Sequence, residues 1–327
     1  MSPACRRLCP SSSSIPTQYL FSQHTLRRRY SITSADTVAS DFLAKSQYSD
    51  PYTQTQVLDA NQLQRLSATL SRPELAKHLP KNGTPLPPGY HLAYFTPSQV
   101  ERDLGRDGTD TTFTPPSPFT RRMWAGGEIE WVGRANKLRL GQEVTEITRL
   151  VSAKGKRNST GEQMIVVGVE KKFQNDHGLA LIDKRNWIFR PEIQAPLTPT
   201  AKPKPVAFPE GKYVRDFCQT PVTLFRFSAL TFNAHKIHYS KEWCQGFEGH
   251  RDLVVHGPLN LINLLNFWRD VREGDATPKK ITYRATSPIY AGESYRVIME
   301  DEVGKVTEVK IVDSYGQVSM VGSVESS

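Results

Sequence analysis

A densely apolar segment in the last third of the sequence, residues 258–271, limits the possible folds more than any other feature. Its large apolar side chains cover most of a helical circumference, and Pro258 and Gly274 mark its expected start and end. Such a helix has to be buried nearly all round. Three or four strands are expected after it, with turns at Gly304-Lys305 and Tyr315-Gly316. They are 281–286, 294–303, 306–314 and 317–324. A buried helix followed by an antiparallel meander predicts a sheet that curls around that helix.

The first half of the chain predicts a weaker version of the same plan. Residues 36–75 are expected to be helical, because their leucines lie at helical spacing and Asp59 is placed to cap a helix. Residues 79–119 are rich in turn-forming residues and predict a long loop with one short strand at 91–95. Three β-rich segments then predict strands at 138–152, 163–174 and 179–190.

A proline-rich segment separates the two halves. Residues 191–209 contain six prolines, which is typical of a linker. We therefore expect a linker at 191–212 between an N-terminal domain, 36–190, and a C-terminal domain, 213–327. Alternating apolar residues predict a strand at 221–232, early in the second domain. The predicted fold class is α+β.

The positive charge is concentrated at the N-terminus. The chain has 327 residues and a formal net charge of +9, yet its first 35 residues contain no acid and five arginines. Arg-rich, Ser-rich and acid-poor N-termini are typical of mitochondrial transit peptides. The sequence Arg28-Arg29-Tyr30-Ser31-Ile32 resembles a matrix processing site, so we expect a transit peptide at 1–30 and a mitochondrial matrix location. Without it, 37 basic residues face 33 acidic ones, a net charge of +4. The alternative is a disordered basic tail.

Composition excludes several functional classes. No apolar run approaches the ~18–20 residues that cross a bilayer, so no membrane span is expected. Only Cys218 and Cys244 lie outside the expected transit peptide, too few for a disulfide framework. No RNA-binding signature, zinc finger or basic stripe is present, which argues against nucleic acid as a partner. A monomer and a homodimer both remain open.

The stretch from Phe227 to Pro258 carries the chemistry. It contains four of the chain's eight histidines within a span of 22 residues: His235, His238, His250 and His256. We expect it to run from a strand end through a loop to a helix N-terminus. Backbone N–H groups at a helix start are unpaired, and the helix dipole favours negative charge there. Gly257 would allow close approach of a ligand, as the oxyanion of a thioester enolate requires.

This stretch resembles the active-site region of MaoC-like hydratases and dehydratases, the (R)-specific hydratase 2 group with the hot-dog fold. Residues 85–95 and 121–127 extend the similarity to double-hot-dog members, including mesaconyl-CoA-type hydratases. Together with the expected transit peptide, the chain most resembles fungal mitochondrial hydroxyacyl-thioester dehydratases of type 2. The resemblance implies a double hot-dog, with two antiparallel sheets each wrapped around a helix, and no cofactor.

The resemblance also implies roles for individual residues. His238 takes the position of the catalytic histidine, and Gly257, after His256, takes that of the oxyanion-hole glycine. The family's aspartate falls on Asn233 and its asparagine on His235. An amide cannot act as a general base, but it can orient water, substrate or an imidazole. Either His238 works alone, or His235 or an acid from elsewhere replaces the aspartate.

The implied reaction is the reversible removal of water from (R)-3-hydroxyacyl thioesters in fatty acid synthesis. His238 would take the C2 proton and return it to the departing hydroxyl, and Gly257 N–H would stabilise the enolate oxygen. The substrate would be an acyl-ACP or acyl-CoA thioester, with acyl carrier protein as a possible partner. Basic residues that could face the carrier are Arg226, Lys236 and Arg284.

Three alternatives stay open. A mesaconyl-CoA-type hydratase is the main enzymatic one, and an arginine placed to bind a distal carboxylate would favour it. A non-catalytic thioester-binding protein is suggested by Asn233. A zinc site of His235, His238, His256 and Cys244 lacks finger or ribbon spacing, so we expect no metal. His250 is expected to be solvated, and His256 to be a structural hydrogen-bonding residue.

Overall fold

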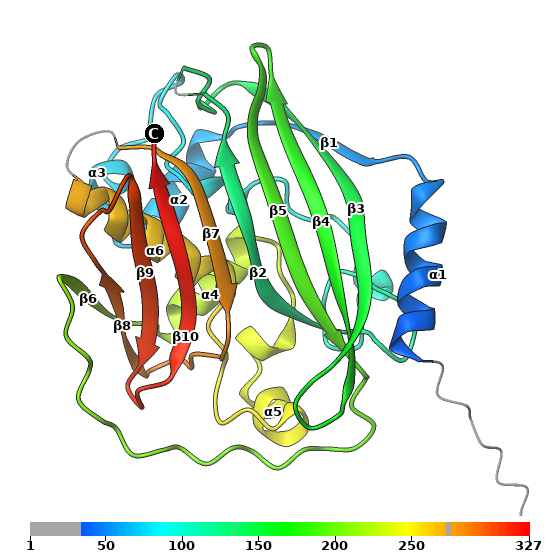
Figure 1. Ribbon diagram of the computed structural model, residues 1–327. Helices are drawn as coiled ribbons and strands as arrows, with labels where there is room; N and C mark the ends of the chain where they lie inside the picture. Colours follow the sequence, from blue (N-terminus) through cyan, green and yellow to red (C-terminus); the bar gives the residue numbers. More distant parts are fainter. Residues whose placement is uncertain (1–33, 134, 273–275) are drawn as a thin grey trace, which may run out of the picture. The chain divides into compact units, whose positions relative to one another are not determined.

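The computed structural model describes residues 34–133, 135–272 and 276–327, and these form one compact unit (Figure 1). The expected transit peptide, 1–30, lies outside the described residues. Within the described ranges, no helix is both long and apolar enough to cross a membrane.

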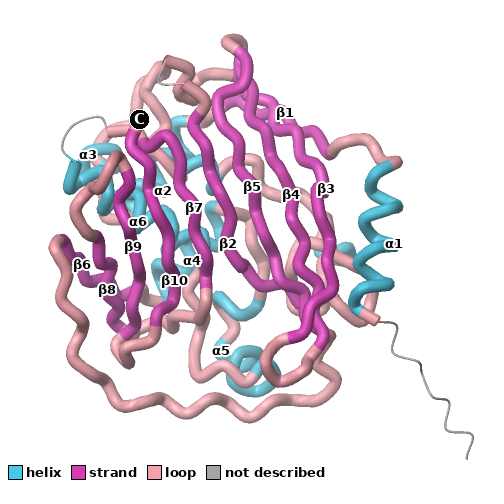
Figure 2. Tube along the Cα trace, viewed as in Figure 1, coloured by secondary structure: helices cyan, strands magenta, loops and turns pink. Residues whose placement is uncertain are grey.

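Ten strands form one continuous antiparallel sheet in the order β1-β3-β4-β5-β2-β7-β10-β9-β8-β6 (Figure 2). Strands of the first half are β1 (Tyr52–Val57), β2 (Arg121–Trp131), β3 (Glu143–Arg157), β4 (Gln163–Asn175) and β5 (Gly178–Arg190). Strands of the second half are β6 (Tyr213–Cys218), β7 (Pro278–Ala285), β8 (Ser294–Met299), β9 (Val306–Asp313) and β10 (Val318–Ser326). The two halves join where β2 pairs with β7.

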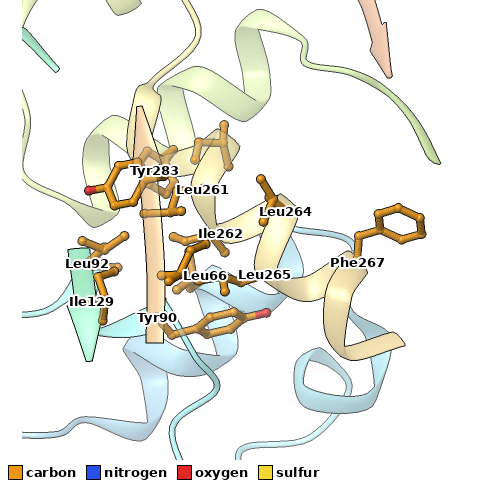
Figure 3. Close-up of a cluster of buried hydrophobic side chains, with 14 of the residues drawn as sticks. Leu66, Tyr90, Leu92, Ile129, Leu261, Ile262, Leu264, Leu265, Phe267 and Tyr283 are labelled. Atoms are coloured by element: carbon orange, nitrogen blue, oxygen red, sulfur yellow. The ribbon is translucent and has the colours of Figure 1, made fainter. Parts of the chain in front are cut away.

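Helix α6 (Gly257–Arg272) is the centre of the second half. Every residue from Leu259 to Trp268 is buried, which confirms the expectation of a helix buried nearly all round. Its side chains also meet residues of the first half, among them Leu66, Tyr90 and Ile129 (Figure 3). One hydrophobic core therefore spans both halves of the sheet.

Residues 36–75 were expected to be helical throughout, and this is wrong. Helix α1 (Ala35–Gln47) ends before Pro51, strand β1 follows, and only then do α2 (Ala60–Thr69) and α3 (Pro73–Ala76) begin. Strand β1 lies at the sheet edge and is mostly exposed, so its sequence lacks a clear apolar alternation. The expected cap is confirmed, because the Asp59 carboxylate accepts a hydrogen bond from the Gln62 N–H.

The strand expected at 91–95 is also wrong. Residues Tyr90–Ala93 form a short 3₁₀ helix, η1, and all four are buried. Their apolar character reflects core packing: His91 and Phe95 both contact the edge of the Phe173 ring on β4. This segment therefore packs against the first half of the sheet at Phe173.

Residues 221–232 form a helix and not the expected strand. Helix α4 (Pro221–Leu230) starts at Thr220, whose side chain accepts from the Thr223 N–H, with proline in the first turn. The alternating residues that suggested a strand also place Leu224 and Phe227 on one helical face, and both are buried. The strand of this region is β6, just before the helix.

Residues 191–212 contain no helix or strand and run from β5 to β6 along the lower edge of the view (Figure 1). Leu197 N–H and Thr200 N–H bond to the Phe247 and Gly249 carbonyls. The two-domain division at this segment stays a prediction, because sheet and core are continuous across the two halves.

Candidate active site

The histidine-rich stretch forms one wall of a large cleft. It begins at the C-terminal end of α4, and not at a strand end as expected. It passes through three short helical turns: η3 (Lys236–His238), α5 (Lys241–Trp243) and the π-helical turn η4 (Cys244–Glu248). It then reaches α6. The cleft has a volume of about 1310 Å³ and all five expected site residues line it: Asn233, His235, His238, His256 and Gly257.

His238 is held in one tautomer by the backbone. Its Nδ1 lies 2.7 Å from the Val254 carbonyl oxygen. A carbonyl can only accept, so Nδ1 carries the proton and Nε2 of the neutral ring is left as an acceptor. Burial lowers the pKa of His238 to about 4. The ring is therefore neutral at physiological pH and can act as a base.

The His256 ring packs against the His238 ring. The two rings stack with centroids 3.6 Å apart, and His256 Nε2 lies 2.9 Å from the Ser228 hydroxyl. Burial, together with His238, holds the pKa of His256 well below its usual value. These contacts agree with the expected structural hydrogen-bonding role.

Asn233 uses one side of its amide for the local turn. Its Oδ1 accepts a hydrogen bond of 3.1 Å from the His235 N–H, an Asx-type turn. Asn233 lines the cleft, and its Nδ2 group has no hydrogen-bond partner among the described residues. The His235 ring is buried, and burial is the main cause that lowers its pKa well below the usual value.

Asp107 is a site residue that the sequence analysis missed. Its Oδ2 lies 3.5 Å from His235 Nε2, and its Oδ1 accepts from Thr109 N–H and hydroxyl. The loop docks tightly, because Asp107 carbonyl accepts from Lys236 N–H and Gly108 packs on Ala234. A Cβ at Gly108 would lie 2.1 Å from the Ala234 carbonyl oxygen, and its φ is +82°. The only signal in the sequence is an aspartate beside a glycine in a long loop.

Gly257, the first residue of α6, lies against Trp124, a second residue that was not predicted to be part of the site. A Cβ on Gly257 would lie 2.8 Å from Cδ1 of Trp124 on β2. Trp124 in turn stacks on Tyr283 of β7, with ring centroids 6.2 Å apart. A side chain at 257 would displace Trp124, so the glycine is required by packing as well as by any ligand.

His250 was expected to be solvated, and this is wrong. Its side chain is 25 % exposed, its Nδ1 lies 3.2 Å from the Tyr290 hydroxyl, and burial lowers its pKa to about 4. Glu248, 3.8 Å away, accepts from the Trp243 indole N–H, and burial raises its pKa.

The structure does not assemble the four-residue zinc set considered from the sequence. Cys244 donates to the Ile237 carbonyl, and burial raises the pKa of its thiol to about 12. A different group has metal-compatible geometry: Asp107, His235 and Glu248 bring ligand atoms within 4.8 Å of one another. Of the three basic candidates, only Lys236 lines the cleft, with its ammonium group 4.5 Å from the centre of the Trp243 ring.

Comparison with known proteins decides the family. The family model for hydroxyacyl-thioester dehydratase type 2 matches residues 89–291. The chain belongs to this family. It is therefore a hydro-lyase, as expected from the sequence.

Two curated proteins are similar to this hydroxyacyl-thioester dehydratase. Mesaconyl-C(4)-CoA hydratase from Chloroflexus aurantiacus is 32% identical over 239 residues, covering 71% of this chain and 80% of the relative. Hydroxyacyl-thioester dehydratase type 2, mitochondrial, from Schizosaccharomyces pombe is 27% identical over 270 residues, covering 73% and 86%.

Solved structures confirm the fold. A MaoC-like dehydratase from Phytophthora capsici has a TM-score of 0.63 at 14% identity and covers 88% of this dehydratase and 98% of that chain. A Mycobacterium tuberculosis protein with a double hotdog fold has a TM-score of 0.51 at 12% identity, covering 86% and 97%. The predicted α+β double hot-dog fold is thus confirmed, but the expectation of two separate sheets is wrong, because the pairing of β2 with β7 joins them into one ten-stranded sheet.

Proposed function

We propose that the enzyme converts (R)-3-hydroxyacyl thioesters reversibly to trans-2-enoyl thioesters, with His238 as the group that moves the proton. The observation that carries the proposal is the fixed tautomer of His238. Its Nδ1–H is bound to the Val254 carbonyl, and Nε2 is free to accept a proton in a cleft beside the start of α6. A base held in this way needs no rearrangement before it reacts.

The reaction begins when Nε2 of His238 removes the proton from C2 of the substrate. The electron pair moves toward the thioester carbonyl, and negative charge builds on its oxygen. Backbone N–H groups at the start of α6, with Gly257 first, and the helix dipole stabilise this charge. The C3–O bond then breaks, and the imidazolium returns its proton to the leaving hydroxyl, which departs as water. The Val254 carbonyl stabilises the transient imidazolium through the Nδ1–H bond.

Asn233 and His235 complete the site. The Asn233 Nδ2 group, opposite the Oδ1 used in the turn, would donate to the C3 hydroxyl or to water. Asp107, from another part of the chain, lies 3.5 Å from His235 Nε2, and we propose that it supplies the carboxylate that Asn233 lacks. His235 and Asp107 would hold the loop that presents Asn233 and His238.

Location and carrier follow from a different set of observations. The fungal relatives are named mitochondrial, and the first 35 residues have the composition of a matrix-targeting peptide. We therefore place the enzyme in the mitochondrial matrix, acting on acyl-ACP or acyl-CoA in fatty acid synthesis. Lys236 at the cleft would attract an acidic carrier protein or the phosphates of coenzyme A.

The test replaces the proposed base. His238→Ala should lower the rate of crotonyl-CoA hydration by about 10²–10⁴-fold, because the proton acceptor is lost. His177→Gln, an exposed histidine in the β4–β5 turn, is the matched control and should keep the wild-type rate. Circular dichroism checks that both variants are folded. A folded His238→Ala enzyme with the wild-type rate would disprove the assignment.

A second candidate is hydration of an enoyl thioester that carries a carboxylate. The identity to a mesaconyl-C(4)-CoA hydratase favours it. A wild-type enzyme that hydrates carboxylated enoyl-CoA well and crotonyl-CoA poorly would select this candidate.

A further inference from the structure

Two buried carboxylates lie close together beside His235 without a basic partner. Asp107 comes from the loop at 105–109 in the first half, and Glu248 ends the π-helical turn η4 in the second. Only 11 % of the Asp107 side chain and 6 % of the Glu248 side chain is exposed. Among the residues that the structure describes, neither carboxylate forms an ion pair with a lysine or an arginine. Their ionisable neighbours are His235 and His250.

This arrangement differs from that of other acids in the interior. Three other buried carboxylates each form an ion pair at 2.6–2.7 Å: Glu146 with Lys171, Asp183 with Arg185, and Glu293 with Arg251. Two carboxylates buried side by side repel each other, and burial of a charge without a partner is costly. Burial raises the pKa of Glu248, and the more distant charge of Arg121 only opposes this change. A cation between the two carboxylates would remove their repulsion.

The His235 ring adds a third group with no partner. Only 6 % of this residue is exposed, and its Nε2 has no hydrogen-bond partner among the described residues. Asp107 Oδ2 lies 3.5 Å from this nitrogen, beyond the usual range of hydrogen bonds. A buried polar atom without a partner costs free energy. A ring nitrogen of His235, an oxygen of Asp107 and an oxygen of Glu248 all lie within 4.8 Å of one another.

Both carboxylates are oriented through one oxygen, which leaves the other for a ligand. Asp107 Oδ1 accepts hydrogen bonds from the N–H and the hydroxyl of Thr109, so Oδ2 is the oxygen that faces His235. Glu248 Oε1 accepts a hydrogen bond of 2.8 Å from the Trp243 indole N–H. Outer contacts of this kind fix the direction of metal-binding side chains.

The ligand types and their spacing suit zinc. Zn²⁺ binds imidazole nitrogen and carboxylate oxygen at about 2.0–2.2 Å in tetrahedral geometry, so its ligand atoms lie about 3.3 Å apart. The 3.5 Å between Asp107 Oδ2 and His235 Nε2 is close to this value. The other separations, which are within 4.8 Å, need to shorten by at most about 1.5 Å. Because His235 and Glu248 line the cleft, a fourth ligand position would be open to water.

We infer that Asp107, His235 and Glu248 form a binding site for a zinc ion. The ion would join three segments that are distant in the sequence: the loop at 105–109, the turn before η3, and η4. His235 lies three residues before His238, so the ion would also fix the turn that presents the proposed base. The inference does not depend on the proposed reaction, because it concerns ion binding to the enzyme without substrate.

The test measures zinc on the full chain without an affinity tag. Elemental mass spectrometry gives the zinc content after purification without chelators. Calorimetric titration of chelator-treated protein gives the affinity for Zn²⁺, and the visible spectrum of the Co²⁺-loaded protein reports tetrahedral geometry. The ligand variants are Asp107→Asn and Glu248→Gln, which remove a charge at nearly constant size. The matched control is Glu242→Gln, an exposed glutamate on the neighbouring turn α5.

We expect the wild type and Glu242→Gln to bind a single Zn²⁺ ion per chain and to melt at a higher temperature when zinc is present. Each ligand variant should bind zinc at least about 100-fold more weakly, the largest effect typical of losing a group that only orients a ligand. Mg²⁺ should not raise the melting temperature, because it prefers octahedral oxygen ligands. Circular dichroism checks that the variants are folded, and the wild-type measurements decide the question even where a variant is not.

Three results would overturn the inference. A wild-type protein that binds no zinc would mean that a shared proton, and not a metal ion, relieves the repulsion between Asp107 and Glu248. Zinc binding of unchanged strength in both folded ligand variants would place the ion elsewhere on the chain. Equal effects of Mg²⁺ and Zn²⁺ would show only a general attraction of cations to acidic groups. Failure of the proposed function is a separate result, because none of these measurements involves turnover.

Discussion

At the scale of single residues, Asn233 shows how one side chain can serve a turn and a reaction. The resemblance places the family's aspartate at this position. The Asn233 amide forms the turn, since its Oδ1 accepts from the His235 N–H, and it has a donor on its other side. A carboxylate could keep the first role and would lose the second.

Asn233→Asp and Asn233→Ala should therefore separate the two roles. Both remove the Nδ2 donor, so both should lower kcat for crotonyl-CoA hydration by about tenfold, the value of one hydrogen bond in the transition state. Only Asn233→Ala removes the turn acceptor and should also lower the melting temperature. Steady-state kinetics and thermal unfolding of the two variants provide the check. Wild-type kcat in Asn233→Ala would show that the donor has no part in the reaction.

At the scale of elements, helix α6 does two jobs. Its buried middle fills the core, and its N-terminus faces the cleft with unpaired N–H groups. Strand β2 fixes this end through Trp124, which fills the space above Gly257. The contact couples the position of the proposed oxyanion site to packing between the two halves of the sheet.

Gly257→Ala should disturb both functions of this helix end. The new Cβ would lie 2.8 Å from Trp124 Cδ1, so the indole has to move. We expect a loss of about 1–3 kcal/mol in the free energy of unfolding, typical of overpacking, and a larger fall in kcat than in the affinity for substrate. Gly246→Ala is the control, since a Cβ there meets nothing within 4 Å. Urea unfolding and kinetics measure the two effects, and equal behaviour of both variants would contradict the argument.

At the scale of the whole molecule, the fold lowers the pKa of five described histidines. Burial is the main cause for His91 in the first half and for His235, His238, His250 and His256 in the second. In the unfolded chain these rings bind protons near pH 6.5. Below that pH the unfolded state binds more protons than the folded state, so the free energy of unfolding decreases as pH is lowered. The stability that these neutral rings preserve is fully present above pH 6.5 and is lost as pH falls toward about 4.

The free energy of unfolding should thus decrease steeply between pH 6.5 and pH 5. In this window, each buried histidine lowers the free energy of unfolding by up to about 1.4 kcal/mol for each pH unit. Urea unfolding at several pH values should show a falling midpoint with an unchanged slope of the transition. His177→Gln should not alter this pH dependence, because His177 is exposed. A midpoint that stays constant from pH 7 to pH 5 would show that these five histidines already bind protons in the folded state.

Sequence by itself determined the features that depend on strong local patterns. The apolar helix, strands β3 to β5 and β7 to β10, and the glycine turns follow from spacing and residue type, whereas β1, β2 and β6 were not predicted. The motif from Asn233 to Gly257 identified five residues that line one cleft. It could not separate strand from helix at 221–232, because the same residues fit both periods and only packing of Leu224 and Phe227 decides.

Tertiary structure alone decided what surrounds those five residues. Asp107 and Trp124 come from the first half of the chain, far from the motif in sequence. Trp124 lines the cleft because β2 pairs with β7, and Asp107 contacts His235 because the loop at 105–109 docks on Ala234 and Lys236. Contacts between distant segments leave no periodic trace in a single sequence. The site residues of the second half could therefore be predicted from the sequence. Those of the first half could not, because they meet the site only through the shared sheet and core.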